Sequence, residues 1–321
     1  MDQPVTERIR RNELERAFAH LAELGASTDL TGTTDPLQQF VTVIRTLMPR
    51  YGDVGPAQNL DGVDFAPVAA GGVTGEWVRP PGADPEHRIL FIHGGGWVGG
   101  SPHDYRQVTA TLARFAHANV LAVDYRLAPE HRFPSGLDDC VNAFRWALRH
   151  GPESEGSKDT QARRLSVVGD SAGANLAAAT ALELASHGER VPDRLVLIAG
   201  TLDNRPGSGR IGIDDPIATA ESLTAATAAY LGPDGNPADY RVSPVYAPRD
   251  LLAKFPPTLL QASTIETLIH DTRKFAARLE NAGVRTNVSV WPELPHVWHA
   301  FLGLFPEARE ALREIADFVN R

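Results

Sequence analysis

Residues 165–186 read LSVVGDSAGANLAAATALELAS and decide the fold. The apolar start predicts a strand, the alanine-rich end predicts a helix, and GDSAG lies between them at 169–173. A strand, a sharp turn and a helix in this order are typical of a nucleophile elbow, whose turn holds a serine in a strained, exposed position. Glycines flank Ser171 because side chains there would collide with the neighbouring strand and helix. We therefore predict Ser171 as the nucleophile, with the amide of Ala172, at the helix N-terminus, as an oxyanion donor.

A second glycine motif, HGGGW at residues 93–97, ends an apolar strand. Three consecutive glycines let backbone N–H groups approach a substrate closely. We expect Gly94 and Gly95 to donate to the oxyanion together with Ala172. A flexible loop and a phosphate cradle are the alternatives. A phosphate loop needs Lys-Ser or Lys-Thr after its glycines, and the sequence continues with VGG at 98–100.

The segment DYRLAPEHRFP at residues 124–134 lies between the two motifs. In this order the three sequences resemble the hormone-sensitive-lipase-like family of α/β hydrolases. The resemblance runs from about residue 89 to the C-terminus. It implies an α/β hydrolase fold, in which a mostly parallel central sheet is flanked by helices and carries a helical cap. It also implies a carboxylesterase that cleaves short- to medium-chain esters with no metal and no organic cofactor.

A serine nucleophile needs a base that takes its proton and an acid that orients the base. In this fold the chain order is serine, acid, histidine. His296 lies in a loop after a predicted strand, so we expect it to be the base, whereas His299 resembles the first residue of a helix. We expect His93 to hold the glycine loop by hydrogen bonds. Five other histidines lie in segments with no catalytic pattern: His20, His87, His117, His150 and His187.

The acid is where the sequence departs from the commonest pattern of the resembled family. That pattern has Asp before Pro-Leu, followed after one residue by another Asp. Here residues 263–271 read STIETLIHD. Aligning Leu268 and Asp271 with the pattern places Glu266 at the acid position, where glutamate is chemically equivalent. We interpret Asp271 as a helix-start charge that complements the helix dipole.

The other residues in these motifs receive structural or binding roles. We expect Trp97 and Trp298, beside the oxyanion loop and the base, to line the substrate pocket, and Phe301 either to line it or to pack in the core. Asp170 is interpreted as structural. Tyr125, Arg126 and Glu130 are expected to form a hydrogen-bonded turn. Cys140 has apolar neighbours at helical spacing, which predicts a buried position.

Composition narrows the class of protein. The chain has 321 residues, a formal net charge of −9 and one cysteine. A charge of −9 spread without long acidic runs argues against nucleic acid or an anionic membrane surface as partner and favours a small-molecule ester. A homodimer stays open. The start lacks an apolar signal core and no apolar run reaches spanning length, so a cytoplasmic location is the default. One cysteine forms no internal disulfide, and no metal-ligand spacing is present.

Apolar runs alternate with amphipathic segments along the chain, which predicts a parallel sheet covered on both faces. The predicted strands are 76–79, 88–92, 120–125, 165–169, 194–199, 257–262 and 286–291. The predicted helices are 105–115, 137–148, 172–186, 271–282 and 308–319, with further helical stretches at 7–24 and 37–47. Two segments break the alternation. We therefore divide the chain into the N-terminal part of a cap (1–61), a first core part (62–202), a cap insertion (203–249) and a second core part (250–321).

These residues predict acyl transfer by a Ser171, Glu266 and His296 triad through an acyl-enzyme. Two alternatives stay open at this point. The same triad could cleave lactones or amides, because the cap sequence does not decide among them. The scaffold could also serve a non-catalytic ligand-binding protein, although a complete triad argues against that role.

Overall fold

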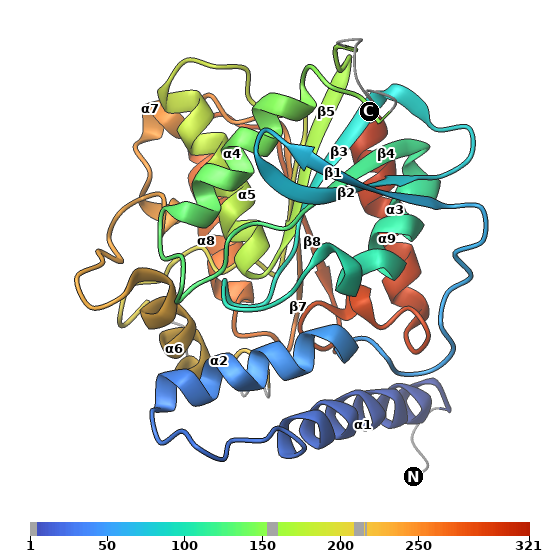
Figure 1. Ribbon diagram of the computed structural model, residues 1–321, viewed down its shortest axis with the longest axis vertical. Helices are drawn as coiled ribbons and strands as arrows, with labels where there is room; N and C mark the ends of the chain where they lie inside the picture. The colour runs from blue at the N-terminus through green and yellow to red at the C-terminus, as the bar shows by residue number, and fades with distance from the viewer. Residues whose placement is uncertain (1–4, 153–159, 209–214, 216) are drawn as a thin grey trace.

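An eight-stranded sheet forms the centre of the protein (Figure 1). The computed structural model describes residues 5–152, 160–208, 215 and 217–321, with side chains from Arg10 onward. The strands are β1 (Asp64–Ala70), β2 (Val73–Arg79), β3 (Asp84–Ile92), β4 (Ala118–Val123), β5 (Arg164–Asp170), β6 (Leu195–Ile198), β7 (Thr258–Ser263) and β8 (Thr286–Trp291). Their order across the sheet is β1-β2-β4-β3-β5-β6-β7-β8. The pairs β1–β2 and β2–β4 are antiparallel and the other pairs are parallel.

The predicted strands correspond to β2 through β8, and the predicted mostly parallel sheet is confirmed. Strand β1 was not predicted. It lies at the edge of the sheet, pairs only with β2 in the sheet order, and leaves most of its residues at least partly exposed. It also contains Pro67, which is tolerated at an edge because proline lacks the N–H that a central strand needs.

Helices cover both faces of the sheet because successive side chains of its central strands point to opposite sides. In β3, Ile89 and Phe91 join one apolar core with α3 (Arg106–Ala116) and α9 (Pro306–Asn320). On the other face, Leu90 and Ile92 join a second core. That core contains α4 (Ser135–Ala147), α5 (Ala172–Ser186) and α8 (Ile269–Asn281). The alanine-rich α5 is buried on nearly all sides, as its composition predicts.

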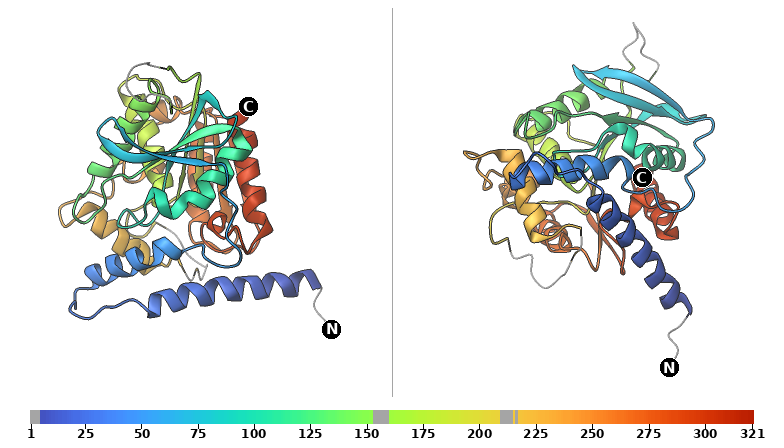
Figure 2. Two further views of the ribbon diagram at one scale, coloured as in Figure 1. Left: turned by 45° about the vertical axis from the view of Figure 1, so that its right-hand side comes forward. Right: turned by 60° about the horizontal axis from the view of Figure 1, so that its bottom comes forward.

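Three further helices lie together at one end of the sheet: α1 (Val5–Ala26), α2 (Pro36–Leu47) and α6 (Ala220–Leu231). We call them the cap helices. Figure 2 shows α1 lying across this end of the molecule, beside α2, which in turn contacts α6. Side-chain caps begin two of them: the Asp35 carboxylate accepts from Leu37 N–H, and the Thr219 hydroxyl accepts from Ser222 N–H. The sequence had not predicted α6.

Short helices connect these elements. They are η1 (Met48–Arg50), η2 (Pro102–Tyr105), η3 (Pro244–Tyr246), α7 (Arg249–Leu252) and η4 (Trp298–Ala300). Of these, η1 follows α2 and η4 follows the loop after β8, so both lie next to segments that carry site residues.

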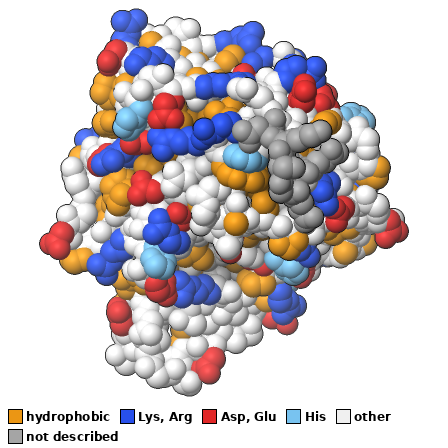
Figure 3. All heavy atoms as spheres, turned by 45° about the horizontal axis from the view of Figure 1, so that its top comes forward, with side chains coloured by type: hydrophobic (Ala, Val, Ile, Leu, Met, Phe, Trp, Pro, Cys, Tyr) orange, Lys and Arg blue, Asp and Glu red, His pale blue; other side chains and the backbone are white. Residues whose placement is uncertain are grey.

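The surface mixes charges of both signs. On the face turned forward in Figure 3, basic and acidic side chains are interspersed among the residues that the structure describes. This distribution agrees with a net charge of −9 that is spread along the chain. Across the described segments, no helix has both the length and the apolar character required to span a bilayer.

Candidate active site

The turn between β5 and α5 places Ser171 in a strained conformation, with φ 52° and ψ −118°. Gly169 and Gly173, two residues to either side, have no room for a side chain. A Cβ on Gly169 would collide with the carbonyl oxygen of Gly173, and a Cβ on Gly173 would collide with that of Ile92 on β3. A non-glycine residue with positive φ is uncommon and marks a position that the surrounding structure enforces. The predicted elbow geometry is therefore present at this serine.

The structure brings the three predicted triad residues together. Ser171 Oγ lies 2.9 Å from His296 Nε2, and His296 Nδ1 lies 2.8 Å from Glu266 Oε1. With Nδ1–H donating to the carboxylate, Nε2 of the neutral imidazole is left to accept the serine proton. Two backbone amides also hold the carboxylate: Ser263 N–H donates to Oε2 (2.6 Å) and Val297 N–H to Oε1 (3.3 Å).

Burial and charge set the protonation of this pair. Burial disfavours the protonated imidazole of His296, but the hydrogen bond and charge of Glu266 outweigh it, so the pKa of His296 is raised above its ordinary value. The carboxyl of Glu266 is fully buried, and burial raises its pKa while the hydrogen bond to His296 opposes that shift. An imidazolium formed next to this carboxylate is thus stabilised, which is what a general base needs.

The oxyanion loop differs from the prediction at Gly94. Its N–H donates to Asp170 Oδ1 (3.0 Å) and also lies 3.2 Å from the hydroxyl oxygen of Tyr105. The amide is therefore already bound and faces away from the cavity beside Ser171, to whose wall Gly95 and Gly96 contribute. This geometry contradicts the prediction that the Gly94 amide donates to an oxyanion, because that amide already has an acceptor in Asp170.

Asp170 has a defined structural task. Its Oδ2 accepts from Tyr105 O–H (2.7 Å) while its Oδ1 holds Gly94, so this carboxyl fixes the start of the glycine loop. Burial raises the pKa of Asp170 to about 7, against the opposing effect of these hydrogen bonds. The sequence interpretation of Asp170 as structural agrees with these contacts.

His93 holds the same loop from the other side. Its Nδ1 lies 2.8 Å from the carbonyl oxygen of Gly94, and its ring stacks on Tyr125 with 4.4 Å between centroids. Tyr125 O–H also donates to the carbonyl oxygen of His93 (2.9 Å). Burial lowers the pKa of His93 to about 4, so the ring is neutral at physiological pH and packs as a structural residue.

A cavity of about 490 Å³ opens beside Ser171 and His296. This volume is within the range of small-molecule sites. The cap helices supply most of its apolar wall. The lining side chains that come from them include Phe18, Leu21, Phe40, Val43, Leu47, Leu223 and Ala226. The sequence had predicted a cap over the site without identifying which of its side chains face the cavity.

The two tryptophans predicted to line the pocket do not line this cavity. Trp97 has φ 61°, and its ring stacks on Tyr230 of α6 with centroids 4.4 Å apart. Trp298 is fully buried in the core with Phe301 and lies 4.2 Å from the ring of His299. Both predictions of substrate contact are corrected: these rings are packing residues, and so is Phe301.

His299 and Asp271, the alternative candidates for base and acid, form hydrogen bonds outside the triad. His299 Nε2 lies 2.8 Å from Gln261 Oε1, and burial lowers the pKa of His299 to about 3. Asp271 Oδ2 accepts from the amides of Leu202 (2.7 Å) and Asp203 (2.8 Å). Both roles lie outside the triad, although Asp271 does stand in the first turn of α8 as predicted.

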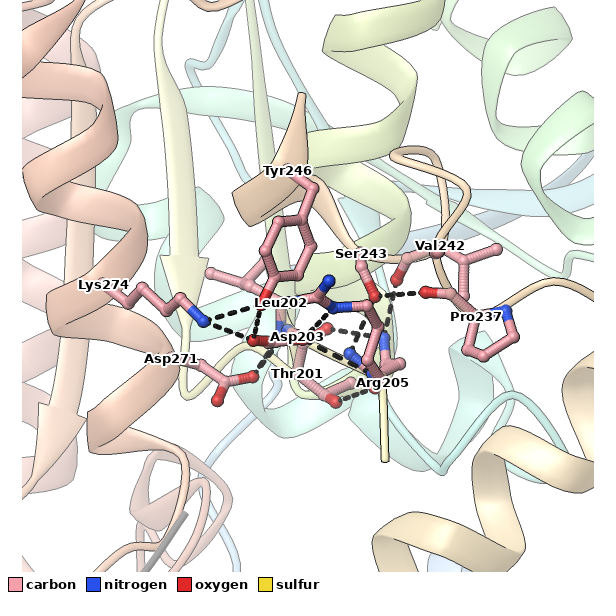
Figure 4. A network of polar contacts seen from close by, with 12 residues as sticks. Thr201, Leu202, Asp203, Arg205, Pro237, Val242, Ser243, Tyr246, Asp271 and Lys274 are labelled. Carbon is pink, nitrogen blue, oxygen red and sulfur yellow. Dashed lines mark hydrogen bonds and ion pairs between the residues drawn. The ribbon is translucent and has the colours of Figure 1, made fainter. Parts of the chain in front are cut away.

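Figure 4 shows the surroundings of Asp271, where the chain leaves the core after β6 and returns before η3. The buried Asp203 carboxylate accepts from Lys274 Nζ (2.6 Å) and from Tyr246 O–H (2.6 Å). Arg205 lies over the Tyr246 ring at 3.3 Å from its centroid. Asp271 therefore belongs to the polar network that fixes both ends of the segment that carries α6.

Sequence reasoning missed two aromatic hydroxyls at the site. Tyr51, which follows η1, donates to the carbonyl oxygen of His296 (2.6 Å), and Tyr105 at the end of η2 binds Asp170. Neither lies in a recognisable motif, because each reaches the site through tertiary packing. Cys140 is buried, as predicted. Among the described residues, no cluster of three or more histidine, cysteine or carboxylate side chains is arranged for a metal ion.

Comparisons with known proteins agree with this geometry. A family profile described as alpha/beta hydrolase fold matches residues 89–300. An esterase of Acinetobacter venetianus is 33% identical over 261 residues, covering 80% of this chain and 82% of the relative. The carboxylesterase/phospholipase LipF of Mycobacterium tuberculosis is 36% identical, covering 77% of this chain and 66% of that protein. The crystal structure of an esterase from the bacterial hormone-sensitive lipase family aligns with a TM-score of 0.78 at 32% identity, over 100% of this chain and 99% of that chain.

Proposed function

The chain belongs to the hormone-sensitive-lipase-like family of α/β hydrolases and is a carboxylesterase, and from this premise we propose that it hydrolyses short- to medium-chain esters with a Ser171, Glu266 and His296 triad. The observation that carries the proposal is the continuous hydrogen-bonded chain from Ser171 Oγ through His296 to Glu266, with 2.9 Å and 2.8 Å between its heavy atoms. Such an arrangement, at the floor of an apolar cavity, suits nucleophilic acyl transfer.

In the acylation step, Ser171 Oγ attacks the ester carbonyl carbon while His296 Nε2 takes the serine proton. The carbonyl oxygen becomes an oxyanion, and the tetrahedral intermediate collapses as the C–O bond to the alcohol breaks. The leaving alkoxide takes the proton from Nε2 and departs as the alcohol. Glu266 keeps Nδ1 protonated throughout and stabilises the imidazolium between the two proton transfers.

The oxyanion is proposed to bind the amides of Gly95, Gly96 and Ala172. Two observations support this set: the Gly95 and Gly96 residues line the cavity, and Ala172 is the first residue of α5. At a helix N-terminus the amide is unpaired within the helix and the dipole favours negative charge. Donors fixed in place before the reaction stabilise developing charge without reorganising.

Water then completes the cycle. His296 removes a proton from a water molecule, whose oxygen attacks the acyl carbon, and the second tetrahedral intermediate releases Ser171 and the carboxylic acid. The proton that Ser171 first gives to His296 leaves with the alcohol, and the proton that His296 takes from water is returned to Ser171, so atoms and protons balance over the cycle. No step requires a metal ion or an organic cofactor.

The cap is proposed to set the acyl preference. We assign residues 1–61 and 203–249 to it and residues 62–202 and 250–321 to the catalytic core. The cavity of about 490 Å³ is walled by apolar side chains of α1, α2 and α6, which favours burial of an acyl chain of moderate length. Lactones and activated amides present the same carbonyl chemistry, so a substrate screen that includes them defines the class.

The test of this function is the substitution Ser171→Ala. We expect it to lower kcat on p-nitrophenyl butyrate by about a thousandfold or more, because the nucleophile is lost. Circular dichroism and thermal unfolding must remain close to those of the wild type, since the change removes one partly exposed hydroxyl. A folded variant that keeps most of its activity would refute the serine mechanism.

A further inference from the structure

A second carboxylate, Asp215, lies beside the proposed triad and has no part in the mechanism above. Its side chain is buried, with 3% of the residue exposed. Oδ1 accepts from the amides of Ile217 (2.9 Å) and Ala218 (3.0 Å), two residues that line the cavity. Oδ2 accepts from the amide of Thr267 (3.0 Å), the residue that follows Glu266. One carboxylate thus joins the cavity wall to the loop of the proposed acid.

We propose that Asp215 is a positioning residue of the esterase reaction: it reaches from the cap segment to hold the loop of Glu266 and so keeps the acid aligned with His296. This inference rests on the proposed function. Glu266 Oε1 lies 2.8 Å from His296 Nδ1. A displacement of the carboxylate by about an ångström would break this hydrogen bond.

The threonine after the acid makes this contact possible. The stretch 263–271 departs from the commonest pattern of the family at this position, where that pattern has proline and this chain has Thr267. Proline has no backbone N–H and could not donate to Asp215. A buried amide without an acceptor is costly, so a threonine here needs the partner that Asp215 supplies. The bond is therefore a property of this chain's own residues.

A second cap contact acts on the other side of the same pair. Tyr51, which follows α2 and η1, donates its O–H to the carbonyl oxygen of His296 (2.6 Å). The acid loop and the base loop are thus each held from a cap-side segment: one by Asp215 and the other by Tyr51. The two hydrogen bonds therefore connect cap-side segments to both loops of the proposed triad.

The charge of Asp215 also interacts electrostatically with His296. Burial lowers the pKa of His296, but Glu266, then Asp215 and Asp170, favour the protonated ring and raise it overall. The other titratable groups that face this histidine carry no charge at neutral pH: Tyr51, whose pKa burial raises, and His299, whose pKa burial lowers to about 3. Removing the charge of Asp215 therefore lowers the pH at which His296 loses its proton.

The substitution Asp215→Asn separates these effects from a general loss of structure. An asparagine keeps an oxygen for the amides of Ile217 and Ala218, so the cavity wall and KM change little. Its NH₂ group would face the N–H of Thr267, which breaks the bond to the acid loop. We expect kcat on p-nitrophenyl butyrate to fall about tenfold or more, with KM within about twofold of wild type. The acidic limb of the kcat/KM profile should move to lower pH.

Two further variants complete the experiment. Asp215→Glu keeps the charge but displaces the carboxylate, so kcat should fall while the acidic limb stays near its wild-type position. Asp239→Asn is the matched control, because Asp239 lies in the same segment and pairs with Arg241 near the surface (2.8 Å). Both members of that pair are partly exposed and bond to each other, so Asp239→Asn should keep kcat within about twofold of wild type and leave the acidic limb unchanged.

The outcomes are distinct. A folded Asp215→Asn protein whose kcat and acidic limb match those of Asp239→Asn would overturn the proposal. An Asp215→Asn protein with a lower melting temperature but unchanged kcat would also overturn it. If Asp215→Asn does not fold, Asp215→Glu carries the test, and wild-type kcat in that variant would overturn it. Labelling of Ser171 by a fluorophosphonate distinguishes the two proposals. An unlabelled wild-type protein refutes the proposed function, whereas a labelled one with unaffected variants refutes only the role of Asp215.

Discussion

The substitution Glu266→Gln tests which carboxylate serves His296. The structure allows the expected loss of kcat to be calculated. Glutamine removes the charge that stabilises the imidazolium and weakens a buried, charge-assisted hydrogen bond of 2.8 Å. Such bonds contribute about 1.5–3 kcal/mol, which corresponds to about 10- to 150-fold in rate at about 1.4 kcal/mol per factor of ten.

A second effect adds to this loss. If the NH₂ of the glutamine faces Nδ1, His296 must carry its proton on Nε2, and that nitrogen then cannot accept the proton of Ser171. We therefore expect kcat to fall by about two orders of magnitude or more. The acidic limb of the pH profile should also move to lower pH, because Glu266 raises the pKa of His296.

Asp271→Asn is the matched comparison. Asp271 Oδ2 accepts from the amides of Leu202 and Asp203, and an asparagine oxygen can accept the same bonds. The variant should lose about 1 kcal/mol of unfolding free energy and keep kcat within a few-fold of wild type. The assay is initial-rate hydrolysis of p-nitrophenyl butyrate, with active-site concentration measured for each protein. A Glu266→Gln enzyme within about threefold of wild type, or a larger kcat loss in Asp271→Asn, would refute the assignment.

Three further predictions follow from the site. His296→Ala should lower kcat at least as much as Glu266→Gln, whereas His299→Ala should mainly lower the melting temperature; the reverse ranking in the same assay would exchange the two histidines. In a p-nitrophenyl ester series, kcat/KM should rise from acetate toward butyrate or hexanoate, by up to about 0.8 kcal/mol per buried methylene, and fall beyond about eight carbons; an optimum on palmitate, or activation by emulsified lipid, contradicts this. Burial raises the pKa of Asp170 to about 7, so between its ordinary value and that pH the folded protein holds a proton that the unfolded chain has lost. The free energy of unfolding therefore falls as pH rises through this range. Asp170→Asn should remove that slope in urea titrations, and an unchanged slope would show that Asp170 does not titrate there.

Local sequence was sufficient to predict most of the fold and to select Ser171, Glu266 and His296, which the structure brings together. Helix α5 has the predicted bounds because its continuous apolar run marks a buried element, and strand β8 has the predicted bounds although its residues are at least partly exposed. The elbow at Ser171 could be predicted from sequence because steric crowding restricts residues 169 and 173 to glycine. Strand β1 was missed in a segment that contains Pro67, a residue that argues against a strand unless it lies at an edge. Helix α6 was missed in a segment rich in glycine, proline and alanine.

The finer parts of the site depend on tertiary contacts that no local pattern contains. Gly94 and Gly95 are alike in sequence, and only the buried pair of Asp170 and Tyr105 decides that the Gly94 amide is bound. Trp97 lies beside the oxyanion loop in sequence, yet its ring packs on Tyr230 of α6. A tryptophan next to a motif therefore indicates proximity to the site but not the direction of its side chain.

The most direct test of the central claim is covalent labelling of the wild-type protein with a fluorophosphonate. The intact mass should rise by one adduct per chain, and peptide mapping should place that adduct on Ser171. The Oγ of this serine lies 2.9 Å from His296 Nε2, the nitrogen that would take its proton. Absence of an adduct on folded protein, or an adduct on another residue, would contradict the account.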